Sequence, residues 1–119
     1  MNVRRWWPPI AWAVVVLVLN SIPGSALPAT ADGLDKVIHV ALYAVLGMLG
    51  ARAAWTSRPR WRAVEPLVVA IALFGALDEA HQLLVPGRTA DVRDWTADVV
   101  GAGLGAAVVA ATLQRQQPA

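Results

Sequence analysis

Long apolar runs alternate with short polar segments along the whole chain. Each run approaches the length of about 20 residues that an α-helix needs to cross the hydrocarbon core of a bilayer. Prolines and glycines fall between the runs, where they end helices or form turns, as at Pro59, Pro66 and Pro86-Gly87. The pattern predicts an all-α membrane protein, a four-transmembrane-helix bundle in a single domain over residues 1–119, with helices at about residues 6–22, 35–55, 66–85 and 95–113.

Basic residues lie mostly between the apolar runs, and their distribution predicts the orientation of the chain. Cytoplasmic segments of membrane proteins carry an excess of Lys and Arg. If the N-terminus is cytoplasmic, seven basic residues lie inside and three lie outside. We therefore expect both termini in the cytoplasm (N-in/C-in). The seven are Arg4, Arg5, Arg52, Arg58, Arg60, Arg62 and Arg115, and the three are Lys36, Arg88 and Arg93.

The first apolar run also fits a second interpretation. Arg4-Arg5, the apolar stretch after them and the small residues Ala29-Thr30-Ala31 are together typical of a cleavable signal peptide. Cleavage after Ala31 would leave the other three helices in the same orientation. We expect an intact N-terminus and keep cleavage of residues 1–31 as the alternative.

Polar side chains enter the last three apolar runs near the ends that this orientation places outside. Asp35, His39 and Tyr43 are spaced four residues apart and so share one face of a helix. Asp94 and Asp98 lie one turn apart near the start of the fourth run. We expect a ligand-binding or polar cluster made of Asp35, Lys36, His39, Tyr43, Asp78, Glu79, His81, Gln82, Arg88, Asp94 and Asp98.

Asp78 and Glu79 need the most explanation. Asp78 lies about 10 Å below the outer end of the third run, where an ionised carboxylate costs at least a few kcal/mol unless it is paired or solvated. One interpretation is that both residues pair with His39 and the nearby basic side chains and only lock the bundle. The other is an extracytoplasmic pocket that binds a ligand. We favour the pocket, because ionisable residues inside a membrane usually mark a functional site.

Motifs of known catalytic sites are absent from the sequence. It has no GxSxG, no HExxH and no phosphate-binding P-loop, and it has no cysteine. His39 and His81 together with the carboxylates offer the ligand types of a divalent metal site, but no local spacing is diagnostic. We therefore predict no metal and no cofactor. Acid–base catalysis by His39 with a carboxylate stays open on the same residues.

Composition agrees with a membrane protein. The chain is 57% hydrophobic and 15% charged, with a mean hydropathy of +0.52, and a soluble domain of this size has too small an interior to bury so much apolar surface. The basic pI near 9.9 does not indicate nucleic-acid binding, because the basic residues lie where membrane topology alone would put them. Gly101 and Gly105 form a GxxxG pair, which we assign to packing within the chain rather than to a dimer.

Several of these motifs, taken in order, resemble one known family. They are Ser21-Ile22-Pro23, Asp35-Lys36-x-x-His39-x-x-x-Tyr43, Asp78-Glu79-x-His81-Gln82, Pro86-Gly87-Arg88, Asp94 and the glycines from Gly101 to Gly105. Together they resemble the VanZ-like family of small bacterial membrane proteins over nearly the whole chain. Asp98 departs from the family pattern, which commonly has Asn at this place, so a role that needs a neutral amide is in doubt here.

The resemblance implies a multi-pass protein of the bacterial cytoplasmic membrane and a link to glycopeptide (teicoplanin) resistance. Teicoplanin acts outside the membrane on cell-wall precursors, on the side where the charge distribution puts the polar residues. Three hypotheses follow. The protein binds membrane lipids or a lipid-linked wall precursor at the outer face, with Arg88 as the main anion contact. Alternatively, it is an enzyme acting on a lipid head group through His39, Asp78, Glu79 and Arg88, or a structural membrane subunit.

Overall fold

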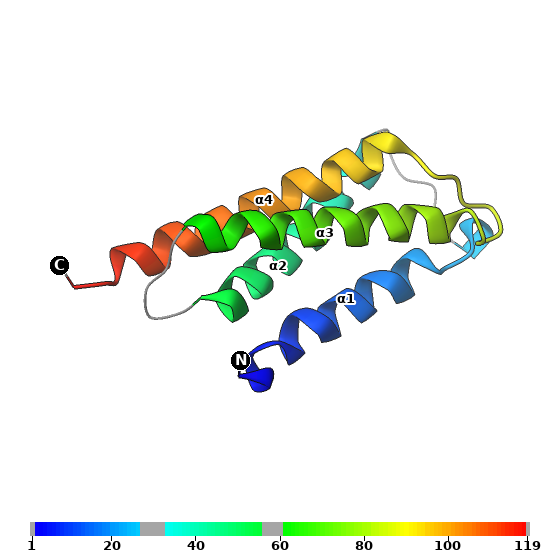
Figure 1. Cartoon of the computed structure of the whole chain (residues 1–119). Helices are drawn as coiled ribbons and strands as arrows, with labels where there is room; N and C mark the ends of the chain where they lie inside the picture. The colour runs from blue at the N-terminus through cyan, green and yellow to red at the C-terminus, as the bar shows by residue number, and fades with distance from the viewer. Residues whose placement is uncertain (1, 27–32, 56–60, 119) are drawn as a thin grey trace.

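The computed structural model describes residues 2–26, 33–55 and 61–118, and within these ranges it contains helices and no strand (Figure 1). Four α-helices follow one another: α1 (Trp7–Asn20), α2 (Leu34–Ala54), α3 (Trp61–Gln82) and α4 (Val92–Arg115). Short 3-10 helices at Val3–Arg5 and Gly24–Ala26 flank α1. The all-helical prediction is confirmed. The possible cleavage site at residues 29–31 and the two arginines Arg58 and Arg60 lie outside the described residues.

The third helix begins five residues before the predicted position. We expected Pro66 to open it, but Pro66 lies inside α3, in the second turn after Trp61. A proline there removes one backbone hydrogen bond near the helix end and leaves the later turns intact. The helix also ends earlier than predicted, at Gln82. The next amides, from Leu83 to Val85, bond to the third residue before them rather than the fourth, which tightens and ends the helix.

The fourth helix begins at Val92, three residues before the predicted start. Asp91 precedes it in an extended conformation, and its side chain accepts a hydrogen bond of 2.8 Å from the backbone N–H of Arg93. Aspartate is among the preferred residues at this position because its carboxylate satisfies an amide that has no partner within the helix. The same hydrogen bond holds the pKa of the Asp91 carboxyl below its ordinary value.

The four helices alternate in direction, so the bundle has two distinct ends. Both chain termini lie at one of them, which we call the terminal end (Figure 1). At the opposite end, α1 and α3 finish and α2 and α4 begin; we call this the polar end. The loop after α1 and the loop after α3 meet there, because the N–H of Gly24 donates to the carbonyl of Pro86 at 3.0 Å.

The closest packing in the bundle is between α2 and α4. A Cβ atom added to Gly101 would lie 2.3 Å from the carbonyl oxygen of Val40, and one added to Gly105 would lie 2.0 Å from that of Ala44. Gly47 approaches the backbone of α4 in the same way, at Ala102. Backbones that pass so closely leave no room for a side chain. The GxxxG pair therefore packs within the chain, as predicted.

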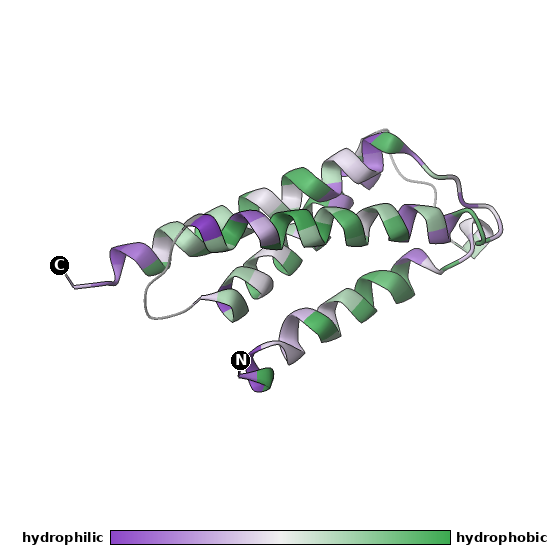
Figure 2. Cartoon of the chain, viewed as in Figure 1, coloured by the Kyte–Doolittle hydropathy of each residue, from purple (hydrophilic) through white to green (hydrophobic). Residues whose placement is uncertain are grey.

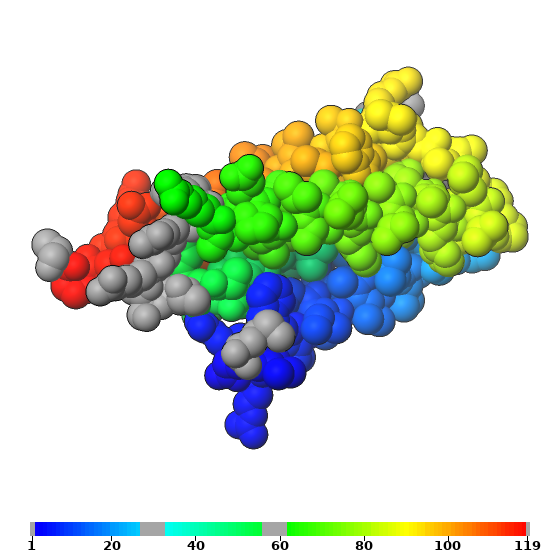
Figure 3. All heavy atoms as spheres, viewed as in Figure 1, coloured from blue at the N-terminus to red at the C-terminus, as the bar shows by residue number. Residues whose placement is uncertain are grey.

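The first helix packs against α2 and α3, and it lies along one side of the bundle in the space-filling view (Figure 3). The Trp12 indole N–H donates to the carbonyl of Leu42 on α2 at 2.9 Å. Val16 is fully buried in a core that also contains Tyr43, Leu46, Ile71 and Ala102. At the polar end, Asn20 reaches Asp78 on α3. These contacts hold α1 in place along its length.

Large apolar side chains cover much of the outer surface of the bundle. Examples are Ile10 and Val18 on α1, Leu73 and Leu77 on α3, and Val108 on α4, each of them more than half exposed. Coloured by hydropathy, the middle parts of α1 and α3 are predominantly apolar, and polar residues gather toward the helix ends (Figure 2). By length and composition, α2 and α4 are long and apolar enough to cross a membrane.

Candidate functional site

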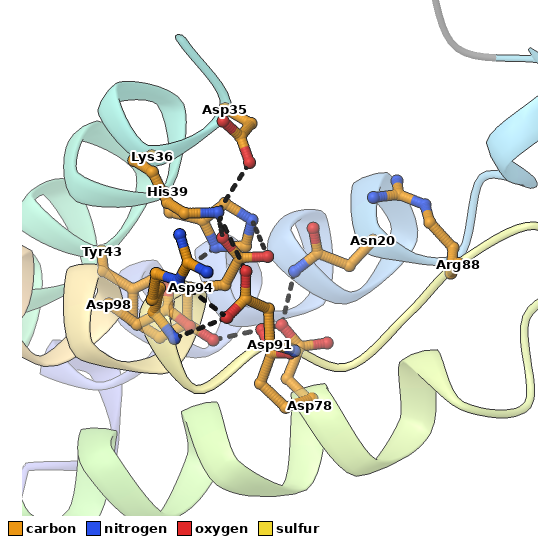
Figure 4. A network of polar contacts seen from close by, with 12 residues as sticks. Asn20, Asp35, Lys36, His39, Tyr43, Asp78, Arg88, Asp91, Asp94 and Asp98 are labelled. Carbon is orange, nitrogen blue, oxygen red and sulfur yellow. Dashed lines mark hydrogen bonds and ion pairs between the residues drawn. The ribbon is translucent and has the colours of Figure 1, made fainter. Parts of the chain in front are cut away.

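Polar side chains from all four helices meet inside the bundle at the polar end (Figure 4). Seven of them are more than nine-tenths buried: Asn20 from α1, His39 from α2, Asp78, Glu79 and Gln82 from α3, and Asp94 and Asp98 from α4. Lys36, Tyr43 and Asp91 make hydrogen bonds to members of this set. We call these ten residues the polar cluster. The placement follows from the alternating helices, which bring the start of α2 and α4 beside the end of α3.

Lys36 forms the outer layer of the cluster. Its ammonium group lies 2.8 Å from an oxygen of Asp35 and 3.3 Å from one of Asp91, and it is closest to Asp94. The side chain is 31% exposed. Three carboxylates thus surround one cation, so Lys36 has little positive charge left to attract an anion from outside.

His39 and Asp98 form the deep layer. Nδ1 of His39 lies 2.7 Å from Oδ1 of Asp98, and its Nε2 lies 3.9 Å from Oδ2 of Asp94. The two acids lie one turn apart on α4, as predicted from their spacing. With the side chain of Asp98 only 1% exposed, this is a histidine–carboxylate pair shielded from water, a geometry that serves either proton transfer or metal binding.

Asp78 links three helices. Its Oδ2 accepts a hydrogen bond of 3.2 Å from the hydroxyl of Tyr43 on α2, and a second, short one from the amide of Asn20 on α1. Tyr43 is itself fully buried. Asp78 therefore joins α1 and α2 to α3 in addition to lying beside the histidine–carboxylate pair.

Glu79 lies where the interior of the cluster meets the surface. Its Oε2 accepts a hydrogen bond of 3.0 Å from the backbone N–H of Asp91, which ties the loop before α4 to α3. A hollow of about 210 Å³ opens beside it, lined by Ala76, Glu79, Ala90, Asp91, Val92 and Trp95. Glu79 and Asp91 are the members of the polar cluster that line this hollow.

Four buried polar atoms have no hydrogen-bond partner among the described residues. They are Oδ1 of Asp78, Oε1 of Glu79, Nε2 of Gln82 and Oδ2 of Asp98. Leaving such an atom unpaired away from water costs about 1–3 kcal/mol, and more for a charged group. Three of the four are carboxylate oxygens. These unpaired oxygens can therefore accept protons or cations that the side chains of the cluster do not supply.

Arg88 and His81 lie beside the cluster rather than in it. The guanidinium of Arg88 donates from Nε to the carbonyl of Ile22 at 2.9 Å and from Nη2 to that of Leu19 at 3.2 Å. In Figure 4 it lies next to the end of α1, away from the carboxylates. Nε2 of His81 is 3.0 Å from the hydroxyl of Ser21. The sequence analysis expected both residues in the polar cluster, but in the structure they contact the end of α1.

Two members of the cluster were missed in the sequence. Asn20 ends the first apolar run, and an amide at that place was the available signal. Asp91 lies in the polar segment between the third and fourth apolar runs. Its position directly before a helix was a capping signal, but its contact with Lys36 depends on the approach of α2 to α4, which sequence spacing does not reveal.

Comparison with known proteins identifies one family. A family model described as VanZ/LLP1 matches residues 4–113, nearly the full chain. No curated protein and no solved structure matches. The resemblance that the sequence motifs indicated is thereby confirmed.

Proposed function

The chain belongs to the VanZ/LLP1 family, and on that basis we propose that it is a multi-pass protein of the bacterial cytoplasmic membrane that binds a lipid-linked component of the cell envelope at the outer face. The observation that carries this proposal is the polar cluster at one end of an otherwise apolar bundle, with a hollow leading to it. Such a site lies where a lipid head group arrives without crossing the bilayer.

The apolar surface supports membrane insertion. Monomeric soluble proteins rarely expose contiguous apolar patches larger than a few hundred Å², whereas here large apolar side chains are exposed on every helix. We propose that α1 and α3 cross the membrane together with α2 and α4. At 1.5 Å per residue the 22 residues of α3 extend about 33 Å, and the 14 residues of α1 about 21 Å. The shorter α1 fits if the bilayer thins locally or if Trp6 and Ser21 extend it.

The distribution of basic residues supports the orientation. Five of the seven arginines predicted to be cytoplasmic are among the described residues, and they belong to segments at or next to the terminal end, whereas the three basic residues predicted outside belong to the polar end. Under the positive-inside rule this distribution supports our proposal that the polar cluster faces the outer surface.

Arg93 is the cation at the polar end best placed to meet an anionic head group. Lys36 is surrounded by carboxylates, and Arg88 donates to the carbonyls of α1. The side chain of Arg93 is 86% exposed, with one long contact of 3.9 Å to Asp91, and it follows Val92 at the rim of the hollow. We therefore propose Arg93, rather than Arg88, as the main contact for the lipid phosphate.

The hollow is lined mostly by apolar residues, and its two acidic ones, Glu79 and Asp91, indicate what the rest of the head group carries. Glu79 and Asp91 accept hydrogen bonds when ionised and donate none. A lipid that bears hydroxyl or amide donors beyond its phosphate satisfies them, whereas a bare lipid phosphate meets repulsion. This chemistry fits a sugar-bearing carrier lipid, the class to which lipid-linked wall precursors belong.

The proposal is tested by lipid binding to the purified full-length chain in nanodiscs. We expect a sugar-bearing lipid phosphate to bind more tightly than either a neutral lipid or a plain lipid phosphate of the same chain length. Arg93→Ala should weaken that binding about tenfold, equivalent to about 1.4 kcal/mol. The matched control is Arg62→Ala, an exposed arginine at the opposite end, which should bind as the unchanged protein does. Equal binding of all three lipids contradicts the proposal.

The enzyme alternative is favoured by one observation, the buried His39–Asp98 pair, which has the geometry of an acid–base couple. It predicts conversion of the bound lipid, measured by mass spectrometry, and loss of that conversion in His39→Gln. A binder leaves the lipid unchanged.

In either case a role in teicoplanin resistance predicts that expressing the chain in a susceptible bacterium lowers teicoplanin susceptibility, and that Arg93→Ala reverses the effect at equal abundance of the protein.

A further inference from the structure

We propose that His39, Glu79 and Asp98 hold a divalent transition-metal ion inside the polar cluster. Each of the three side chains places one ligand atom within 4.8 Å of the other two. They come from three different helices, α2, α3 and α4, which is why no local sequence spacing revealed the site. The inference goes beyond lipid binding and does not depend on it.

The geometry is close to that of an occupied site. Imidazole nitrogens and carboxylate oxygens bind such ions at about 2.1 Å, so neighbouring ligands lie about 3 to 3.4 Å apart. Nδ1 of His39 and Oδ1 of Asp98 are now 2.7 Å apart and share a proton. An ion that replaces this proton needs the pair to open by only a few tenths of an ångström. Glu79 offers the third ligand atom, within 4.8 Å of the other two, and must move closer to them when an ion binds.

Unpaired oxygens supply the second, independent observation. Oε1 of Glu79 and Oδ2 of Asp98 are buried without a hydrogen-bond partner among the described residues, and the two residues are 7% and 1% exposed. The lysine of the polar cluster, Lys36, contacts Asp35, Asp91 and Asp94 in the outer layer. A divalent cation would balance the two carboxylates, while His39 contributes a neutral nitrogen ligand.

Neighbouring contacts already fix the ligands. The backbone N–H of Asp91 holds Oε2 of Glu79 and leaves Oε1 available. Asp94 lies 3.9 Å from Nε2 of His39, on the side of the ring away from Asp98. Partners of this kind orient ligands and tune metal affinity in known sites. The hollow lined by Glu79 and Trp95 gives the ion a path from the surface.

The donor set selects among ions. Oxygen ligands alone would suit Mg²⁺ or Ca²⁺, whereas an imidazole nitrogen favours first-row transition metals such as Zn²⁺, Mn²⁺ and Co²⁺. One histidine with two carboxylates, each giving one ligand atom, leaves at least one coordination position of the ion open.

The test is titration of Zn²⁺, Mn²⁺ or Co²⁺ alone into the full-length chain, purified in detergent and stripped with a chelator. We expect one ion to bind per chain, and Mg²⁺ at the same concentration not to displace it. His39→Gln, Glu79→Gln and Asp98→Asn should each weaken binding at least about tenfold. Two matched controls, His81→Gln and Asp35→Asn, should bind as the unchanged protein does, because these side chains lie outside the proposed ligand set.

Thermal unfolding separates loss of the site from loss of the fold. Glu79→Gln and Asp98→Asn each remove a buried negative charge, so neither should lower the Tm measured without metal. Zn²⁺ should raise the Tm of the unchanged chain and of the two controls, and leave that of the three ligand variants unmoved. The visible spectrum of bound Co²⁺ should change in His39→Gln, which removes the nitrogen ligand. Absence of saturable binding, or equal weakening in His39→Gln and His81→Gln, overturns the proposal.

Discussion

Asp98 accepts one contact from His39 and buries a second oxygen that has no partner in the described part of the chain, and this contrast is repeated at Asp78 and Glu79. In each case the neighbouring helices satisfy one carboxylate oxygen and leave the other unsatisfied. A cluster that served only to lock the helices together would gain stability by pairing both, since an unpaired buried carboxylate oxygen weakens the fold. At the scale of single residues, these unpaired oxygens support our proposal that the cluster is a binding site.

Arg88 has the opposite character, because its donors are used within the protein. Replacing it by alanine removes the hydrogen bonds to the carbonyls of Ile22 and Leu19 at the end of α1. Each such bond contributes about 1 kcal/mol. We expect Arg88→Ala to lower the Tm in detergent and the abundance of the protein in the membrane, and Arg88→Lys to do so less.

Arg93→Ala is the matched control for this prediction, since it removes an exposed arginine from the same end of the bundle. It should leave the Tm unchanged, because a single long contact at the surface contributes little. If Arg88→Ala and Arg93→Ala have the same Tm, then the contacts of Arg88 with α1 do not stabilise the bundle, and its assignment as an anion contact is restored.

At the scale of elements, the contact between α2 and α4 determines where the ligands lie. These two helices carry His39 and Asp98, and their backbones approach closely only because Gly47, Gly101 and Gly105 lack side chains. A wider spacing would move His39 away from Asp98. The glycines near the middle of the bundle thus keep α2 close to α4, and this close approach keeps His39 near Asp98.

Gly105→Ala tests this dependence. The added methyl group would lie 2.0 Å from the carbonyl oxygen of Ala44, so the helices must separate, at a cost of about 1–3 kcal/mol. We expect a lower Tm. Gly103→Ala is the control: nothing lies within 4 Å of its added Cβ, and alanine favours a helix over glycine. Its Tm should stay the same or rise. Equal Tm values for the two variants would show that the α2–α4 contact is not close-packed.

The sequence was sufficient to predict the number and type of the helices, because the apolar runs are long and separated by strong turn residues. It was less reliable at their ends. Pro66 does not start α3, since a proline in the second turn costs a single hydrogen bond, and Asp91 starts α4 earlier than hydrophobicity suggested. Polar residue types could be recognised, but the partners of Asn20 and Arg88 are set by contacts of the end of α1 with α3 and with the loop after α3, which no spacing along the chain encodes.

At the scale of the whole molecule, the central claim is that the polar end faces the outside of the cell. The chain has no cysteine, so single cysteines report their surroundings without background. The most direct measurement is labelling of Gly33→Cys and Arg62→Cys with a membrane-impermeant thiol reagent in whole cells. Both positions are exposed in the structure, at the polar and the terminal end respectively. We predict that Gly33→Cys reacts in intact cells and Arg62→Cys only after the membrane is opened. Reaction of Arg62→Cys but not of Gly33→Cys in intact cells would contradict the account.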